Sequence, residues 1–226
     1  YSSDLIPEES TNLNIGAVWS PSDQFSMKFD YWSINYEDVI TIESAQGKVL
    51  ADPNGPDIVR LVDGTLIGVT TRYKNASEVD TDGYDIEASY NFESRLGNVS
   101  LGINRAHMLS YEIPATGGGM KDVVGLFNQD NFARSLPETK TVISASLTNG
   151  NHSMAAFYRM ISDYETTNVP NALGASLGLG QDIDEFNVLD LKYSYSFEMN
   201  DSNLSLSFGV KNATDEAAPF FYDSAN

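Results

Sequence analysis

Apolar and polar residues alternate along eight segments of the chain. Near the C-terminal end, for example, Lys192 lies between Leu191 and Tyr193. A period of two residues predicts a β-strand with one apolar face and one polar face. The predicted strands are 13–19, 25–31, 85–92 with an upstream extension at 67–73, 98–104, 140–148, 154–161, 189–197 and 204–211. Gly83 is expected to mark a bulge in the third strand.

The predicted strands are joined alternately by short polar turns and by long connections. The short turns are 20–24, 93–97, 149–152 and 198–203, and the long connections are roughly 36–66, 112–138 and 165–185. Connections too short to cross a sheet make sequential strands pair with each other. The sequence therefore predicts an all-β, antiparallel up-and-down sheet with two unlike rims, in a single domain over 1–226.

The same alternation occurs in a soluble β-sandwich, which buries its apolar face, and in a membrane β-barrel, whose apolar face contacts lipid. The polar faces carry Asn, Ser and charged residues without a break, and the long connections exceed those of compact soluble domains. Aromatic residues also gather near the short turns, where an interfacial girdle would lie. These features favour a transmembrane barrel. The predicted girdle consists of Trp19, Phe25, Tyr90, Phe92, Tyr195 and Phe197.

The composition narrows the range of partners. The chain has 13 Lys and Arg against 32 Asp and Glu, which gives a net charge of -19. Nucleic acid is not an expected partner, because binding to a phosphate backbone requires clustered cations. The chain has no cysteine, which rules out disulfides and thiolate metal sites.

Several segments, taken in order, resemble the C-terminal half of a TonB-dependent outer-membrane receptor. They are Leu5–Ser10, Trp19–Pro21, Phe29–Trp32 with Asp38–Ile40, Thr81–Ile86, and Gly209–Glu216. The resemblance implies a barrel of about 22 strands with a plugged lumen, in the outer membrane of a Gram-negative bacterium. The family's plug, its energy-coupling peptide and its final aromatic-ended strand are not found in the sequence. We therefore expect 1–226 to form about eight strands of the wall of a larger barrel.

Few residues are candidates for binding chemistry. Tyr111, Phe127 and Phe132 lie in or beside a long connection and could offer stacking surfaces to a solute. His107 and His152 lack a second ligand at helical or turn spacing, so no metal site is predicted. No nucleophile, base and orienting carboxylate can be assembled, so the protein is not expected to be an enzyme, and no cofactor is expected.

Acidic residues cluster between the second and third predicted strands. The series comprises Asp52, Asp57, Asp63, Glu78, Asp80 and Asp82. Carboxylates are ligands for Ca²⁺, but the tight spacing of a calcium loop is absent. A solvated acidic rim is the favoured interpretation, and Ca²⁺ binding stays open.

The predicted function is transport. The chain is expected to belong to a receptor that captures a scarce solute, such as a ferric siderophore or an oligosaccharide, with its long loops. The expected partners are outer-membrane lipid, the plug domain of the same protein, a TonB-type energy-coupling protein reached through upstream residues, and the small solute. Two alternatives stay open: a complete small outer-membrane barrel with a structural or adhesion role, and a soluble carbohydrate-binding β-sandwich.

Overall fold

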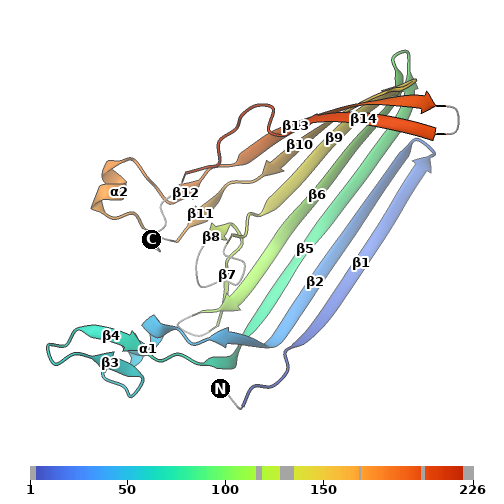
Figure 1. Cartoon of the computed structure of the whole chain (residues 1–226). Helices are drawn as coiled ribbons and strands as arrows, with labels where there is room; N and C mark the ends of the chain where they lie inside the picture. The colour runs from blue at the N-terminus through green and yellow to red at the C-terminus, as the bar shows by residue number, and fades with distance from the viewer. Residues whose placement is uncertain (1–3, 116–118, 128–134, 168, 200–201, 221–226) are drawn as a thin grey trace. The chain divides into compact units, whose positions relative to one another are not determined.

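The computed structural model describes residues 4–115, 119–127, 135–167, 169–199 and 202–220. Eight long strands pair in the order β1-β2-β5-β6-β9-β10-β13-β14, which confirms that the predicted strands pair in sequence order (Figure 1). The eight strands are β1 (Glu9–Ser22), β2 (Phe25–Ile42), β5 (Tyr73–Ser94), β6 (Gly97–Pro114), β9 (Thr139–Asn149), β10 (His152–Ile161), β13 (Phe186–Met199) and β14 (Ser202–Val210).

The short turns are tight, as predicted. His152 on β10 pairs with Asn149 on β9, so Gly150 and Asn151 form the whole turn. Gly150 has a φ of 55°, which a residue without a Cβ adopts at no steric cost. β1 and β14 are the two ends of the strand order, and no pairing between them is found in the described part of the chain. The sheet is therefore open.

The long strands extend further from the short turns than the alternation predicted. β2 continues to Ile42, so 36–42 is strand rather than loop, and β6 continues to Pro114. The predicted extension of the third strand at 67–73 is wrong. Leu66–Val69 forms a separate strand, β4, which pairs with β3 (Ile58–Arg60) because both belong to one local hairpin.

Gly83 lies within the uninterrupted strand β5. A glycine is required at this position because the Trp32 side chain and the His107 backbone lie close to its Cα. A Cβ at this position would lie 2.6 Å from Cζ2 of Trp32 and 2.5 Å from the backbone oxygen of His107. Only glycine leaves room for the indole against the strand. The glycine therefore marks a packing contact of Trp32 within the sheet.

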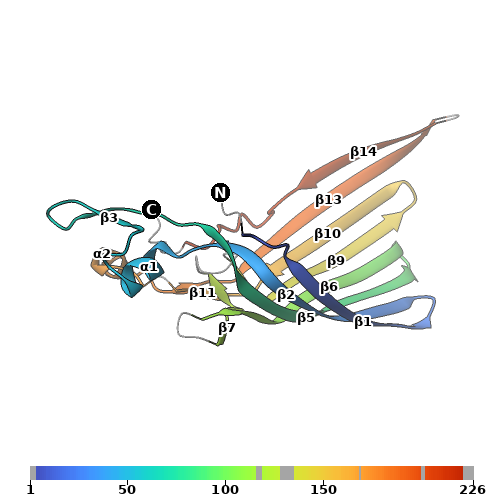
Figure 2. The ribbon, with the colours of Figure 1, turned by 90° about the horizontal axis from the view of Figure 1, so that it is seen from below.

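Side chains alternate between the two faces of the sheet. Ala145 on β9 pairs with Leu101 on β6 and with Ala156 on β10, which in turn pairs with Leu191 on β13. One face is thus apolar across four neighbouring strands, and Figure 2 shows β9, β10 and β13 side by side. Leu191 is 43% exposed and Phe208 on β14 is 70% exposed. A β-sandwich would bury this face, so the sandwich alternative is wrong.

The chain divides into two compact units. One unit comprises 1–12, 34–80 and 112–121, and the other comprises 13–33, 81–111 and 122–226. In the first unit, the connection 43–72 forms helix α1 (Ala45–Ala51) and the β3–β4 hairpin. Ser44 caps α1, because its hydroxyl accepts a hydrogen bond from the Gly47 backbone at 3.0 Å.

In the second unit, two long connections join in a small sheet of their own. The sheet has the order β12-β11-β8, formed by β8 (Leu126–Phe127), β11 (Tyr164–Thr166) and β12 (Asp182–Ile183). Helix α2 (Ala172–Ser176) lies in the chain between β11 and β12, and β7 (Met120–Asp122) pairs with β6. Neither α1 nor α2 is long and apolar enough to cross a membrane, and the described residues contain no other helix that is.

Candidate functional site

The described parts of the connections 115–138 and 162–185 enclose a small apolar core at the loop ends of the strands. Val123, Thr166 and Ile183 are 0%, 1% and 2% exposed. Backbone hydrogen bonds tie the two connections together: Glu165 N–H donates to the Gly125 carbonyl at 2.8 Å, and Thr167 N–H donates to the Phe127 carbonyl at 3.1 Å. These loops therefore hold fixed positions relative to each other, because burial and hydrogen bonds both oppose their separation.

A cavity of about 160 Å³ lies on the polar face of the sheet, beside this loop core. Its wall includes Trp32 from β2, Met108 from β6, Leu136 and Pro137 from the connection, and Lys140 from β9. Leu136 is buried, and its N–H donates to the Leu126 carbonyl at 3.2 Å. The cavity combines an indole, an apolar wall and two exposed charged groups of opposite sign, Lys140 and Glu138, a set that suits an aromatic or apolar solute group with polar groups beside it.

The sequence pattern did not single out this cavity. Trp32 lies at a position where the alternation of β2 predicts a polar residue, since Lys28 and Asp30 precede it on that face. A tryptophan on the polar face is therefore a signal for a site. Leu136 could not be found in this way, because it lies in a connection whose path no periodic pattern predicts.

The structure describes two of the three aromatic residues that the sequence suggested for solute contact. Tyr111 lies on β6, three residues before its end, and is half-buried, and its N–H donates to Oδ1 of Asp122 at 3.1 Å. Phe127 lies in β8, opposite Thr166 of β11. Phe132 falls outside the described residues. A role in solute contact therefore remains a prediction for all three.

The polar face of the sheet carries cross-strand ion pairs. Nη2 of Arg159 on β10 lies 2.8 Å from Oδ2 of Asp190 on β13, and Nζ of Lys28 on β2 lies 3.3 Å from Oε2 of Glu87 on β5. Asp190 also accepts a hydrogen bond from the Asn212 N–H at 2.9 Å. Paired and solvated charges on this face fit a wall that lines water.

In the connection 43–72, the acidic series is held by protein cations and amides. Nζ of Lys48 lies 2.5 Å from Oε2 of Glu43 and 2.8 Å from Oδ2 of Asp57, and Nη2 of Arg72 lies 2.9 Å from Oδ1 of Asp57. Arg72 and then Lys48 lower the pKa of Asp57 to about 2, and Asp57 and Glu43 raise the pKa of Lys48. The pKa of Glu43 is lowered, first by Lys48. We call these four residues the 43–72 ion-pair cluster.

The other acidic residues also have local partners. Asp63 accepts a hydrogen bond from the Thr65 N–H at 2.9 Å, which lowers the pKa of Asp63. Asp80 accepts from the Asn35 amide at 2.6 Å. Within the described ranges, no group of three or more His, Asp or Glu side chains is arranged to hold a metal ion.

Each histidine lies against aromatic side chains. The His107 ring lies 4.8 Å from the Tyr84 ring, and its Nδ1 lies 2.9 Å from Oγ1 of Thr139. Nδ1 of His152 lies 2.7 Å from the Tyr193 hydroxyl, and its ring lies 4.8 Å from that of Tyr195 in an edge-on geometry. Thus His107 lies near the loop ends of the strands and His152 beside a short turn.

The aromatic residues of the predicted girdle lie in pairs beside the short turns. The pairs are Trp19 with Phe25, Tyr90 with Phe92, and Tyr195 with Phe197, at centroid separations of 5.6, 5.3 and 4.7 Å. These separations fall in the range of favourable edge-on or tilted ring contacts. Their position at a membrane interface remains a prediction.

Comparison with known proteins identifies a family and several solved structures that this fold resembles. The family model described as TonB dependent receptor-like, beta-barrel matches residues 1–213. Comparison with curated protein sequences gives no significant match. Among solved structures, the outer membrane transporter YddB from Escherichia coli is 12% identical, with a TM-score of 0.62 over 94% of this chain and 29% of that one.

Two further structures are similar in fold. The copper transporter OprC is 16% identical, with a TM-score of 0.60 over 96% of this chain and 26% of that one. The ferripyoverdine receptor of the outer membrane of Pseudomonas aeruginosa is 17% identical, with a TM-score of 0.56 over 93% of this chain and 24% of that one. Identities this low show the fold alone, and the chain spans less than a third of each structure's length.

The family match extends over nearly the whole described sheet, and the apolar outer face and polar inner face agree with it. The chain therefore belongs to the TonB-dependent receptor β-barrel family, and it forms part of the wall of a barrel in the bacterial outer membrane.

Proposed function

We propose that the chain is the loop-bearing wall of a receptor that binds a scarce solute outside the cell and takes it up with energy from a TonB-type protein. The observation that supports this most is the family match over residues 1–213. The chemistry is binding and gating, without a catalytic step. The ordered loop core gives such a receptor a rigid mouth, and rigid binding groups lose less entropy when a solute binds.

The solute contacts the polar-face cavity beneath the loop core. Trp32 supplies a flat ring, and Lys140 and Glu138 supply one charge of each sign for polar groups of the solute. Tyr111 and Phe127 are further candidates for solute contact, and Phe132, in the same connection, remains a candidate from the sequence. A ferric siderophore has both an apolar or aromatic part and anionic groups, and an oligosaccharide stacks on aromatic rings, so both classes fit.

The plug domain of the same receptor packs against the polar face further from the loops. A groove of about 390 Å³ runs there over β5, β6 and β9. Small side chains line it, among them Ser89, Ser100, Gly102 and Ser144. Small residues let a second surface approach closely, and their hydroxyls satisfy its polar groups. The paired aromatics beside the short turns form the interfacial girdle on the other face.

The names of similar structures guide the choice of solutes for the test. They include a copper transporter, an iron transporter from Neisseria meningitidis, and receptors for ferripyoverdine and ferric enterobactin. The experiment supplies ferric siderophores, copper and oligosaccharides separately to a receptor-deletion strain that carries the wild-type gene. We expect uptake of one solute class that stops when an uncoupler removes the proton gradient. Uptake that continues after uncoupling, or no uptake of any class, would contradict the proposal.

Trp32→Ala tests the cavity directly. We expect an apparent affinity about tenfold weaker, equivalent to ~1.4 kcal/mol, which is typical of an aromatic contact residue. Trp19→Ala is the matched control, because Trp19 lies on the apolar face of β1 and is mostly exposed. Equal affinities for wild type and Trp32→Ala would exclude this cavity as the solute site.

A further inference from the structure

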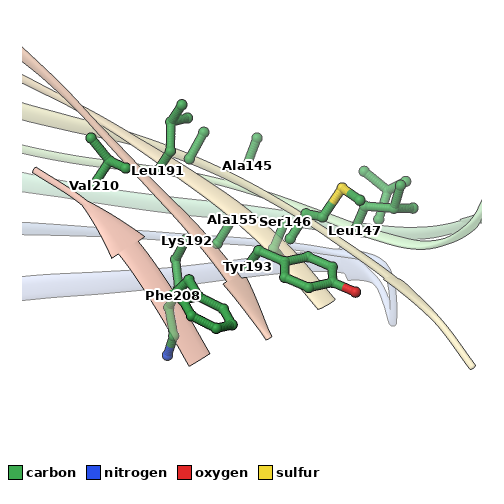
Figure 3. Close-up of a pocket in the computed structure, with 12 residues that line it drawn as sticks. Ala145, Ser146, Leu147, Ala155, Leu191, Lys192, Tyr193, Phe208 and Val210 are labelled. Carbon is green, nitrogen blue, oxygen red and sulfur yellow. The ribbon is translucent and has the colours of Figure 1, made fainter. Parts of the chain in front are cut away.

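The apolar face of the sheet carries a groove of about 540 Å³ over β9, β10, β13 and β14 (Figure 3). Ala145 and Ala156 are paired directly across β9 and β10 and form its floor. The walls are large apolar side chains from these strands and from β6: Val99, Leu147, Met154, Leu191, Phe208 and Val210. The groove is therefore shaped by side-chain size on an otherwise continuous apolar surface.

Cross-strand pairing explains why the surface is hollow at this point. The row that contains Ala145 and Ala156 continues to Leu101 on one side and to Leu191 and then Val210 on the other. The next row towards the short turn pairs Leu147 with Met154 and is filled by long side chains. Two methyl groups bounded by longer side chains leave a slot open to the outside of the sheet.

One end of the groove has a polar group. Tyr193 lines the groove and pairs with Met154, and its hydroxyl lies 2.7 Å from Nδ1 of His152. His152 is exposed and pairs with Tyr195, so it lies on the same face of the sheet as the groove. If the Tyr193 hydroxyl donates to Nδ1, the imidazole keeps its Nε2–H as a donor for an acceptor outside the protein.

The dimensions fit one leaflet of a membrane. Ala156 is four positions along β10 from His152, and a strand rises roughly 3.3 Å per residue, so the polar end and the floor lie about 13 Å apart along the strand. Barrel strands are tilted by about 35–45°, so this distance is about 10 Å along the membrane normal. Half of the hydrocarbon core of a bilayer is about 15 Å thick. The groove is continuous with the apolar face that contacts the outer membrane, so hydrocarbon is its natural occupant. The Tyr195–Phe197 pair lies beside the polar end, because Tyr195 pairs with His152.

We propose that this groove binds one glycerophospholipid of the leaflet on the short-turn side. An acyl chain lies over Ala145 and Ala156, and a phosphate oxygen accepts hydrogen bonds from the His152–Tyr193 pair. The proposal rests on the outer-membrane location and is independent of the solute and of uptake.

Native mass spectrometry of the intact receptor tests this proposal. The receptor is purified from outer membranes, stripped of lipid in detergent, and titrated with palmitoyl-oleoyl-phosphatidylethanolamine. The double variant Ala145→Leu/Ala156→Leu fills the slot, and His152→Ala removes the polar end. We expect each to lower the fraction of receptor with one bound phospholipid by about tenfold. Ala17→Leu on the same face of β1 is the matched small-to-large control, and we expect it to bind as wild type does.

Three outcomes would overturn the proposal. They are equal binding by wild type and the double variant, equal binding by wild type and His152→Ala, and equal binding of a dioleoylglycerol that lacks the phosphate. Heat-resistant migration of each variant on a gel reports that the barrel is folded. Because His152→Ala removes atoms from an exposed side chain, it tests the polar end even if the double variant folds poorly.

Discussion

The connections 43–72 and 162–185 are both long and both ordered, but different forces order them. The first is held by the 43–72 ion-pair cluster, in which Asp57 contacts two cations. The second contributes Thr166 and Ile183, which are almost fully buried, to an apolar core shared with the connection 115–138. Loops of one receptor can thus be fixed either by charge or by burial, and the two should respond differently to mutation, acid and salt.

The largest expected effect is from truncation in the buried connection. Ile183→Ala removes a side chain that is 2% exposed, and such truncations cost about 2–5 kcal/mol. We expect amide hydrogen exchange in 120–127 and 162–185 to become faster together, because the two segments share one core. Leu177→Ala is the control within the same connection, since Leu177 is 69% exposed. Faster exchange in only one of the two segments would show that the core is not shared.

A smaller effect is expected from the ion-pair cluster. Asp57→Asn removes the carboxylate that bridges Lys48 and Arg72, and half-exposed ion pairs contribute less than buried apolar side chains. Nitroxide labels at Leu50→Cys and Val62→Cys, both exposed, report the width of the distance distribution within 43–72. We expect Asp57→Asn to broaden it and Glu37→Gln, on the exposed part of β2, to leave it unchanged. An unchanged width in Asp57→Asn would show that backbone hydrogen bonds alone hold the hairpin.

The sequence predicted the sheet well because its signal is local. Alternation along β13 and β14 depends only on neighbouring residues, and the turn at Asn149-Gly150 follows from their tolerance of positive φ. The β8–β11 pairing could not be predicted from local alternation, because Phe127 and Thr166 are far apart in the chain and no sequence pattern links them. Trp32 is an intermediate case: its position on a polar face could be read from the sequence, but Leu136, which lines the same cavity, could not be found in this way.

Acid should affect the connections 43–72 and 162–185 differently. The pKa of Asp57 is about 2, below its ordinary value of 3.8, so its carboxylate stabilises the fold above about pH 4 and this contribution is lost as the pH falls through 2. Lys48, whose pKa is raised, contributes at all pH values below its ordinary 10.5. We expect the distance distribution between labels at 50 and 62 to be constant from pH 4 to 10 and to broaden below pH 3.

The matched control for the acid titration is Asp57→Asn. This variant should already be broad at pH 7 and should change little between pH 4 and pH 2. Labels at Val169→Cys and Leu177→Cys report the buried connection, which we expect to be unaffected by acid in that range. Broadening of both label pairs at the same pH would mean that acid unfolds the receptor as a whole and that Asp57 has no separate role.

The smallest expected effect is that of salt. Raising the ionic strength from about 0.1 M to 1 M shortens the screening length from about 10 Å to 3 Å. The ion pairs of the 43–72 cluster have separations of 2.5–2.9 Å, so screening weakens them only in part. We expect a slight broadening between labels at 50 and 62 at 1 M NaCl, and none between labels at 169 and 177, because NaCl does not weaken apolar burial. A larger salt response in the buried connection than in 43–72 would reverse the assignment of forces to the two loops.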